Sequence, residues 1–247
     1  MTWLQCRRAV ALAWALTLNL VKLAVMRASG PWTAERRALW LQWSCRRVLS
    51  SLGIHFFVQG EAPRRGLLVS NHLSYLDILI YSAAVPCVFV SKAEVGKWPY
   101  FGFAARQSGT IFIDRSSRAS AQKVAQEIGT RLAVRVPILV FPEGTSSDGS
   151  AVMRFHSSLF QPAAANEAPV TAAAVRYVVE GGVPERELCW YGDEEFLPHL
   201  WRTLNTPGFT AEVRFGASRV FVDRRTASAE THAEVVEMRA EEASLRG

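Results

Sequence analysis

The chain has 247 residues and a mass of 27.4 kDa, enough for one α/β domain with additions and a substantial buried core. Hydrophobic residues make up 49% of it and charged residues 20%, which excludes a chain that is disordered throughout. Its four cysteines are scattered and form no C-x-x-C pair, which argues against a zinc ribbon, a thioredoxin-type site or a disulfide framework.

The positive charge is concentrated near the N-terminus. Of the formal net charge of +6, residues 1–50 carry +7, from eight basic residues against Glu35, and the rest of the chain carries −1. The basic residues are Arg7, Arg8, Lys22, Arg27, Arg36, Arg37, Arg46 and Arg47. Because they lie among Trp, Leu and Ala, the segment is more typical of binding to an anionic membrane surface than of binding to nucleic acid.

An apolar stretch at residues 9–26 predicts the first helix. Its length is marginal for crossing a membrane, which takes about 20 apolar residues. Gln5, Arg8, Asn19 and Lys22 fall on one face, which favours a helix that lies in the membrane interface. The alternatives are a spanning helix with this polar stripe against protein, and a signal peptide. Lys22 and the lack of a clear A-x-A cleavage site count against the signal peptide.

A second basic helix is predicted from Ala34 to Ser50, after Pro31 ends the first. It either shares the membrane contact or packs on the following domain with a solvated basic face. We therefore expect membrane-anchoring helices at residues 1–50, a main domain at 51–225 and a C-terminal helix or tail at 226–247.

After residue 54, short apolar runs alternate with helical stretches. This alternation predicts an α/β fold, with a mixed, largely parallel sheet flanked by helices. Strands are expected at residues 66–70, 88–90, 110–113, 138–141, 170–179, 188–191 and 211–222, and helices at 75–84, 119–135 and 227–245. Ligands of such sheets bind at the carboxyl ends of the strands, so the segments that follow strands are candidates for a site.

His72 and Asp77 follow the first of these strands. Within one helix their side chains would diverge by about 140°, but a turn at His72 before the helix can bring them together. A carboxylate bonded to one ring nitrogen fixes the tautomer and leaves the other nitrogen as a general base. A simpler explanation also fits, in which Ser74 and Asp77 cap the helix and His72 is an ordinary loop residue.

Polar groups also follow two later strands. Arg115 has the chemistry to hold a phosphate through two hydrogen bonds, or it pairs with Asp114 at the surface. Glu143, Gly144 and Thr145 lie in a turn whose backbone N–H groups have the potential to cradle an anion. An ordinary Gly/Ser turn explains the same residues.

Together, these segments resemble the glycerolipid acyltransferase family, whose best-known member is 1-acyl-sn-glycerol-3-phosphate acyltransferase. That family's signature is an N-H-x-x-x-x-D block, a G-x-x-F-I-D-R-like block, an F-P-E-G-T block and a later strand containing proline. The corresponding residues are Asn71-His72…Asp77, Gly109…Phe112-Ile113-Asp114-Arg115, Phe141-Pro142-Glu143-Gly144-Thr145 and Pro169-Val170. The resemblance covers about residues 50–180.

The resemblance implies an O-acyltransferase in which His72 takes the proton of the acceptor hydroxyl, Asp77 orients His72, and the hydroxyl attacks an acyl thioester. The implied contacts to the polar head of the acceptor come from Lys92, Arg115, Glu143, Gly144 and Thr145. Acyl-CoA or acyl carrier protein is the implied donor and co-substrate, with no bound cofactor and no metal. The implied location is the cytoplasmic face of a membrane, where the lysolipid acceptor resides, and no nucleic-acid partner is expected.

The expected acceptor is 1-acyl-sn-glycerol-3-phosphate, whose acylation gives phosphatidic acid. The chain departs from the family pattern at two positions: Ser146 stands where many relatives carry arginine, and Ser158 where they often carry glycine. The first of these bears on the acceptor. A site with fewer cations suits a zwitterionic head group, so lyso-ornithine lipid is the alternative acceptor. The aromatic stretch from Trp190 to Trp201 is similar to stretches in acyltransferases of that lipid.

Two other functional classes fit parts of the pattern. A hydrolase of lipids or thioesters would use the same His72 and Asp77, with water replacing the alcohol, but the chain has no G-x-S-x-G nucleophile elbow. A lipid-binding module without turnover would have no need of a base. The acyltransferase is therefore the leading hypothesis.

Overall fold

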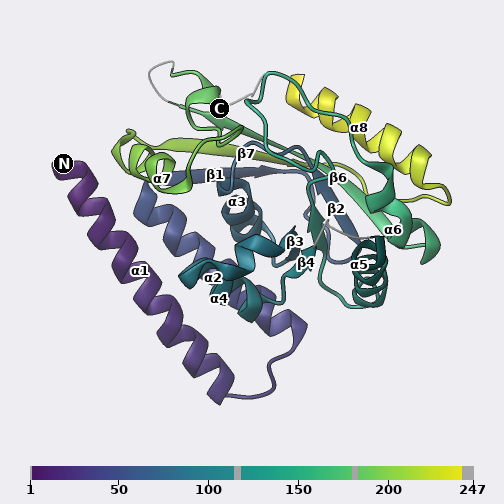
Figure 1. Ribbon diagram of the computed structural model, residues 1–247, viewed down its shortest axis with the longest axis horizontal. Coiled ribbons are helices and arrows are strands. Elements are labelled where there is room, and N and C mark those ends of the chain that lie inside the picture. Colours follow the sequence, from purple (N-terminus) through teal and green to yellow (C-terminus); the bar gives the residue numbers. More distant parts are fainter. Residues whose placement is uncertain (1, 114–117, 180–182, 241–247) are drawn as a thin grey trace.

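The computed structural model describes residues 2–113, 118–179 and 183–240, without the side chains of residues 118–121 (Figure 1). The strands are β1 (Ile54–Gln59), β2 (Leu67–Ser70), β3 (Val88–Lys92), β4 (Ile111–Ile113), β5 (Ile138–Val140), β6 (Pro169–Val178), β7 (Phe209–Phe215) and β8 (Arg219–Val220). The α-helices are α1 (Trp3–Ala28), α2 (Ala34–Leu52), α3 (Leu76–Ala84), α4 (Pro99–Ser108), α5 (Arg118–Arg131), α6 (Gln161–Ala165), α7 (Phe196–Asn205) and α8 (Arg224–Ala240). Short 3₁₀ turns are η1 (Ala93–Lys97), η2 (Ser157–Phe160) and η3 (Glu185–Glu187).

The described strands form one sheet in the order β1-β7-β6-β2-β5-β3-β4, and β8 pairs with the start of β6. All neighbouring pairs are parallel except those that β6 makes with β7 and β8. This arrangement confirms the predicted mixed, largely parallel sheet flanked by helices. Because β2, β5 and β6 are parallel neighbours, their carboxyl ends meet at one edge of the sheet.

Helices cover both faces of the sheet (Figure 1). One core cluster joins α2 and α3 to the face that carries Leu68 and Leu139, and the other joins α5, α6 and α8 to the face that carries Leu67 and Ile138. Successive strand residues point to opposite faces, which is why the buried strands β2 and β5 are apolar throughout rather than alternating.

Helix α2 is bounded by two local signals. Thr33 caps its N-terminus by accepting a hydrogen bond from the backbone N–H of Arg36, and Gly53 ends it with a positive φ of 72°. Its inner side chains, among them Trp40 and Leu49, belong to the main core. The predicted boundary at residue 50 therefore falls inside a helix that shares the core of the main domain, and α8 likewise packs on β6 in the second cluster.

Helix α1 turns its polar stripe towards protein. Gln5, Arg8 and Asn19 are buried, whereas Trp3 and Trp14 are 76% and 62% exposed on the opposite face. This is the orientation considered above for a spanning helix. Among the described helices α1 is the one long and apolar enough to cross a membrane, by length and composition alone.

Two expectations about strands were wrong. Residues 188–191 form no strand: Leu188 and Cys189 are buried, but they follow η3 in an irregular segment whose Trp190 N–H bonds the carbonyl of Leu73. The stretch 211–222 is two strands, because the pairing with β6 is interrupted at residues 216–218 and resumes in β8 with the register moved by one residue. The N–H of Gly216 still bonds the carbonyl of Ala172 at the interruption. A Cβ on Gly216 would displace the carboxylate of Glu234 on α8, which lies against the glycine.

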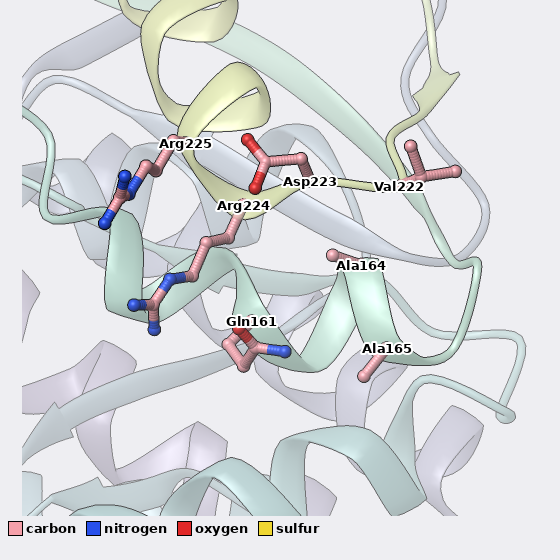
Figure 2. A pocket seen from close by; sticks show the side chains of 7 residues that line it. All are labelled: Gln161, Ala164, Ala165, Val222, Asp223, Arg224 and Arg225. Atoms are coloured by element: carbon pink, nitrogen blue, oxygen red, sulfur yellow. The ribbon is translucent and has the colours of Figure 1, made fainter.

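A cavity of about 430 Å³ opens between α6 and the start of α8 (Figure 2). Its lining residues are Gln161, Ala164, Ala165, Val222, Asp223, Arg224 and Arg225. It adjoins the amino end of β6, the end of the sheet opposite to the carboxyl ends of β2 and β5. None of the site residues predicted from the sequence lines it, so the candidate site lies elsewhere.

Candidate active site

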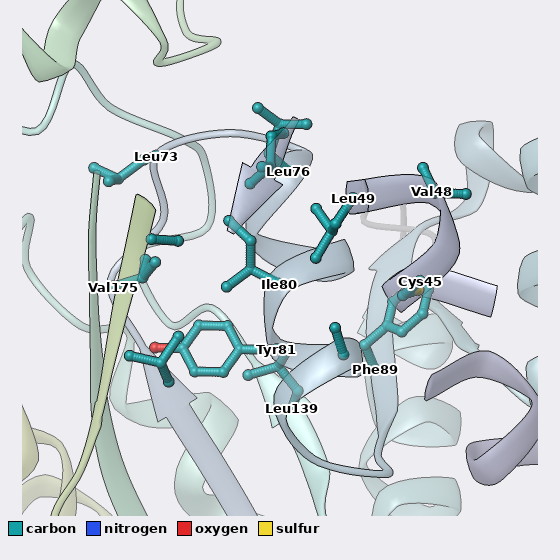
Figure 3. Close-up of a cluster of buried hydrophobic side chains, with 14 of the residues drawn as sticks. Cys45, Val48, Leu49, Leu73, Leu76, Ile80, Tyr81, Phe89, Leu139 and Val175 are labelled. Carbon is teal, nitrogen blue, oxygen red and sulfur yellow. The ribbon is translucent and has the colours of Figure 1, made fainter. Parts of the chain in front are cut away.

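The first and third motif segments lie side by side because β2 and β5 are parallel neighbours. Residues 71–77 leave β2 and residues 141–149 leave β5, and the carbonyl of His72 accepts a hydrogen bond of 2.9 Å from the N–H of Ser147. Beneath them, Leu76, Ile80 and Leu139 form a buried apolar floor (Figure 3). The two segments thus form one surface on a rigid base.

His72 and Asp77 form a hydrogen-bonded pair, with 2.8 Å between Nδ1 of the ring and Oδ2 of the carboxylate. Oδ2 also accepts the N–H groups of Leu73 and Ser74, at 2.6 and 3.0 Å. The carboxylate therefore holds the loop in the turn that brings the imidazole back to it. This confirms the predicted His–Asp geometry. The expected capping box forms only in part: Asp77 accepts the N–H of Ser74, but the N-cap of α3 is Tyr75, which makes no side-chain cap bond.

The imidazole of His72 is held by Asp77 and Phe141, and the backbone of His72 is held by Glu143. Its ring stacks on Phe141 with the centroids 4.0 Å apart, and its backbone N–H donates to Oε2 of Glu143 at 3.1 Å. Asp77 is fully buried, whereas the His72 side chain is 17% exposed. No described residue hydrogen-bonds Nε2, so the second ring nitrogen is available to a molecule outside. The arrangement is suited to a general base.

Glu143 supports the turn rather than opening into solvent. The side chain is buried, and its second oxygen, Oε1, accepts the N–H of Met153 at 3.0 Å. Burial raises the pKa of Glu143 to about 8, against the effect of its two backbone hydrogen bonds. A contact of this carboxylate with the head group stays a prediction, and its position favours support of His72.

The remaining predicted contacts of the acceptor are Gly144 and Thr145 in this turn, and Lys92 and Arg115 on other segments. Gly144 adopts a positive φ of 79°, and its N–H bonds the carbonyl of Phe141 to close the turn. Thr145 is exposed, and Lys92 is exposed at the carboxyl end of β3, two strands away from β2. At about 4.8 Å per strand, this places the end of β3 roughly 10 Å from the end of β2. Arg115 lies outside the described residues.

The aromatic segment after Trp190 supports the site in a way that was not predicted from the sequence. Ser146, the departure from the family pattern, donates its hydroxyl hydrogen bond to the carbonyl of Trp190. The ring of Tyr75 packs edge-on against Trp190, Phe196 and His199, with centroid distances of 5.7, 4.9 and 5.3 Å. This segment is therefore one wall of the loop that carries the His–Asp pair.

His199 links this wall to the loop through a hydrogen bond of 3.0 Å between its Nδ1 and the hydroxyl of Tyr75. It is fully buried, and burial lowers its pKa, which keeps the ring neutral. Its local signal was only a histidine inside an amphipathic aromatic stretch.

Tyr177 is a second residue that sequence patterns did not single out. It lies on β6, 100 positions after Asp77, and its hydroxyl donates to Oδ1 of that carboxylate. The available signal was a tyrosine at a buried position of a strand otherwise rich in alanine and valine.

Residues 35–176 match the model of a protein family described as Acyltransferase. The chain belongs to this family. The match covers more than half of the chain and includes both motif segments around His72 and Glu143.

Curated relatives carry two different acceptor names. A lyso-ornithine lipid O-acyltransferase of Pseudomonas aeruginosa is 37% identical over 66% of this chain and 63% of its own length. Another lyso-ornithine lipid O-acyltransferase, of Rhizobium meliloti, is 35% identical over 75% of this chain and 68% of its own length. A 1-acyl-sn-glycerol-3-phosphate acyltransferase of Neisseria meningitidis is 35% identical over 69% of this chain and 68% of its own length. The chain therefore matches about two thirds of the length of each relative.

The fold is also found in a solved structure. The 1-acyl-sn-glycerophosphate (LPA) acyltransferase PlsC of Thermotoga maritima superposes with a TM-score of 0.68, covering 98% of this chain and 97% of that one. At 19% identity, the likeness is one of fold. The two chains therefore share one fold over almost their whole length.

Proposed function

We propose that this protein transfers a fatty acyl group from a thioester donor to the free hydroxyl of a lysolipid. The observation that carries the proposal is the His72–Asp77 pair, in which a buried carboxylate fixes one ring nitrogen and no hydrogen bond reaches the other from any described residue. The family match and the names of the relatives support the same class of reaction.

In the proposed reaction, Nε2 of His72 takes the proton of the acceptor hydroxyl as its oxygen attacks the thioester carbonyl carbon. The carbon–sulfur bond then breaks, and the departing sulfur takes the proton from the imidazolium. Asp77 stabilises the imidazolium between the two proton transfers. The acceptor oxygen is itself the nucleophile, so no covalent acyl-enzyme is formed. The donor is acyl-CoA or acyl carrier protein.

For the acceptor, we propose lyso-ornithine lipid first and lysophosphatidate second. The relatives of Pseudomonas and Rhizobium are named for the former, the relative of Neisseria for the latter. Ser146, which replaces the arginine of many relatives, adds a hydroxyl bonded to Trp190 and no cation. This favours a zwitterionic head group over a phosphate dianion, the reverse of the order expected from the family resemblance.

We also propose that α1 attaches the protein to the cytoplasmic face of the membrane that holds the acceptor. Its exposed face presents Trp3, Val10, Trp14, Val21 and Val25 at spacings of seven and four residues, which is one continuous helical stripe. The basic residues of α1 and α2 add attraction to anionic lipid of about 1 kcal/mol each where they lie near its surface.

The test is an assay of the purified full chain on lyso-ornithine lipid and on lysophosphatidate in mixed vesicles, with acyl-CoA and with acylated carrier protein. We expect a diacyl lipid as the product and a kcat/KM at least tenfold higher for lyso-ornithine lipid. A kcat/KM at least tenfold higher for lysophosphatidate would show instead that lysophosphatidate is the preferred acceptor. Free fatty acid as the main product would instead identify a hydrolase.

A further inference from the structure

We infer that Tyr177 is a positioning residue of the His–Asp pair: its hydroxyl holds the outer oxygen of Asp77, and so sets the basicity of His72. The inference rests on the proposed role of His72 as a general base. Tyr177 lies outside the motif segments and comes from the opposite side of the site, on β6.

The two oxygens of Asp77 have very different surroundings. Oδ2 is bonded by the ring of His72 and by two backbone N–H groups of the loop. Among the described residues, Oδ1 receives only the hydroxyl of Tyr177. Since Asp77 is fully buried, water does not replace that donor when it is lost. A buried carboxylate oxygen without a donor is costly, so this hydroxyl matters to the charged form of Asp77.

The position of the hydroxyl is fixed by the strand that carries it. Tyr177 is buried, its N–H donates to Oε1 of Glu185 at 2.7 Å, and its ring packs 4.8 Å from that of Phe209. Two residues earlier, Val175 is held by both ends of the Asn71 side chain, at 2.9 and 3.1 Å. Because Asn71 precedes His72, β6 is held in register with the loop that it supports.

The hydroxyl of Tyr177 is a neutral donor. Burial, and next the charge of Asp77, raise its pKa well above 10, so it keeps its proton over the working range of pH. The other ionisable groups near the pair are Glu143 in the neighbouring turn, Tyr81 on α3, Cys189, and the ion pair of Glu185 with Arg239. None of these is recorded as a hydrogen-bond partner of Oδ1.

Loss of this donor is expected to change the proton affinity of His72 in one direction. With Tyr177→Phe, the negative charge of Asp77 is less dispersed and its field at the imidazole is stronger. The ring then binds its proton more tightly, and its titration moves to higher pH by about one unit. The carboxylate is also free to shift, and misplacement of a base lowers kcat by about 10- to 100-fold, with little change in KM.

Tyr81 offers a matched control. It is also fully buried at this edge, but its hydroxyl bonds Oγ of Ser70 at 2.6 Å instead of Asp77. Tyr81→Phe also removes one buried hydroxyl, but this hydroxyl has a different hydrogen-bond partner. If Tyr177 served only packing, the two variants would lose similar stability and neither would change the titration of His72.

The experiment is an NMR titration of the full chain with labelled histidine, with the His72 signal assigned from its loss in His72→Gln. We expect the midpoint to rise in Tyr177→Phe and to stay unchanged in Tyr81→Phe, and kcat to fall only in the former. Replacement of Tyr177 by 3-fluorotyrosine, a stronger donor of nearly the same shape, is expected to lower the midpoint.

The titration does not depend on turnover, so it separates this inference from the proposed function. An unchanged midpoint in both Tyr177 variants overturns the inference, whatever the activity. A shifted midpoint in a protein that acylates no lysolipid upholds the inference and overturns the proposed function. If Tyr177→Phe does not fold, the fluorinated protein decides alone.

Discussion

At the scale of single residues, the proposed reaction depends on His72 and on the few atoms that hold its ring. Five residues of spacing and a turn before α3 were enough to predict its pairing with Asp77, because both residues belong to one short segment. Tyr177 approaches the same carboxylate from a strand 100 residues later. Its role depends on the packing of β6 beside β2, which no local pattern encodes.

Replacement of His72 by alanine is expected to remove acyl transfer, by the 10²- to 10⁴-fold that a general base typically contributes. The structural effect should be small, because the carboxylate of Asp77 keeps its two backbone donors and its hydroxyl donor. The measurements are kcat/KM and a melting curve, with His55→Ala as the control, since His55 is exposed on β1. Turnover above a tenth of wild type would show that the base is another group.

Glu143 makes stability depend on pH with a defined sign. Burial raises its folded-state pKa to about 8, above its ordinary value of 4.5, so the folded protein retains a proton that the unfolded chain loses. This contribution is fully present below pH 4.5 and is lost as the pH rises through about 8. We therefore expect the Tm of wild type, relative to that of Glu143→Gln, to fall between these two values.

The glutamine variant is the appropriate reference because it carries no charge at any pH, and other titrating groups cancel in the comparison. A difference in Tm between the two proteins that stays constant from pH 4.5 to pH 8 would show that Glu143 is ionised throughout. Its two backbone N–H partners would then outweigh its burial.

At the scale of elements, the strands of the sheet centre and the edge strand β4 were predicted from the sequence, but the other edge strand, β1, was not. β2, β5 and β6 are buried on both faces, so they appear in the sequence as short apolar runs. β1 was not predicted: it is an edge strand with half of its side chains turned outward, including Phe57. α7 was not predicted, because residues 190–201 were read only as an aromatic stretch. Pro198 is compatible with the helix, since it lies in the first turn, where a backbone N–H would have no partner within the helix.

The end of α7 is held by a residue from the opposite end of the chain. Arg8 of α1 is buried and donates to the carbonyls of Leu204, Thr206 and Pro207. These carbonyls lack partners within the helix, and a cation also suits the negative end of the helix dipole. α7 carries His199, which bonds the loop next to the His–Asp pair.

Arg8→Ala is therefore expected to destabilise the fold by about 1.5–3 kcal/mol, the range for hydrogen bonds to a charged group. Hydrogen exchange should increase first at the end of α7 and in the segment that follows it. Arg7→Ala is the control, because Arg7 is exposed and packs only against the ring of Trp3 among its described contacts. Equal protection of α7 in the two variants would exclude this role of Arg8.

At the scale of the whole molecule, the predicted anchor and the predicted domain are one packed body. Removal of residues 1–50 would delete most of α2, whose Trp40 and Leu49 lie in the main core. A truncated protein would therefore test folding rather than membrane attachment. Composition correctly located the apolar and basic residues, but it does not show which side of each helix the core covers.

Attachment is better tested on the exposed face of α1. Double substitution of Val10 and Trp14 by glutamate changes side chains that are 70% and 62% exposed, so the fold should persist. Each apolar side chain that no longer enters the bilayer removes about 1.5–3 kcal/mol. We expect the variant to leave anionic vesicles in flotation assays, whereas Val222→Glu, a control 89% exposed on another surface, should remain bound. Unchanged flotation of the double variant would place the attachment elsewhere.

The contact of Arg8 with residues 204–207 also has a consequence for the order in which the nascent chain folds and meets a membrane. A ribosome synthesises the partner segment of α1 almost 200 residues after Arg8, which at 5–20 residues per second is a delay of about 10–40 s. Throughout that interval, the emerging helix has its apolar stripe exposed and its inner polar groups without their final partners. The nascent chain can therefore meet a bilayer before its own tertiary structure exists, and the packing of residues 204–207 onto α1 would then take place at the lipid surface.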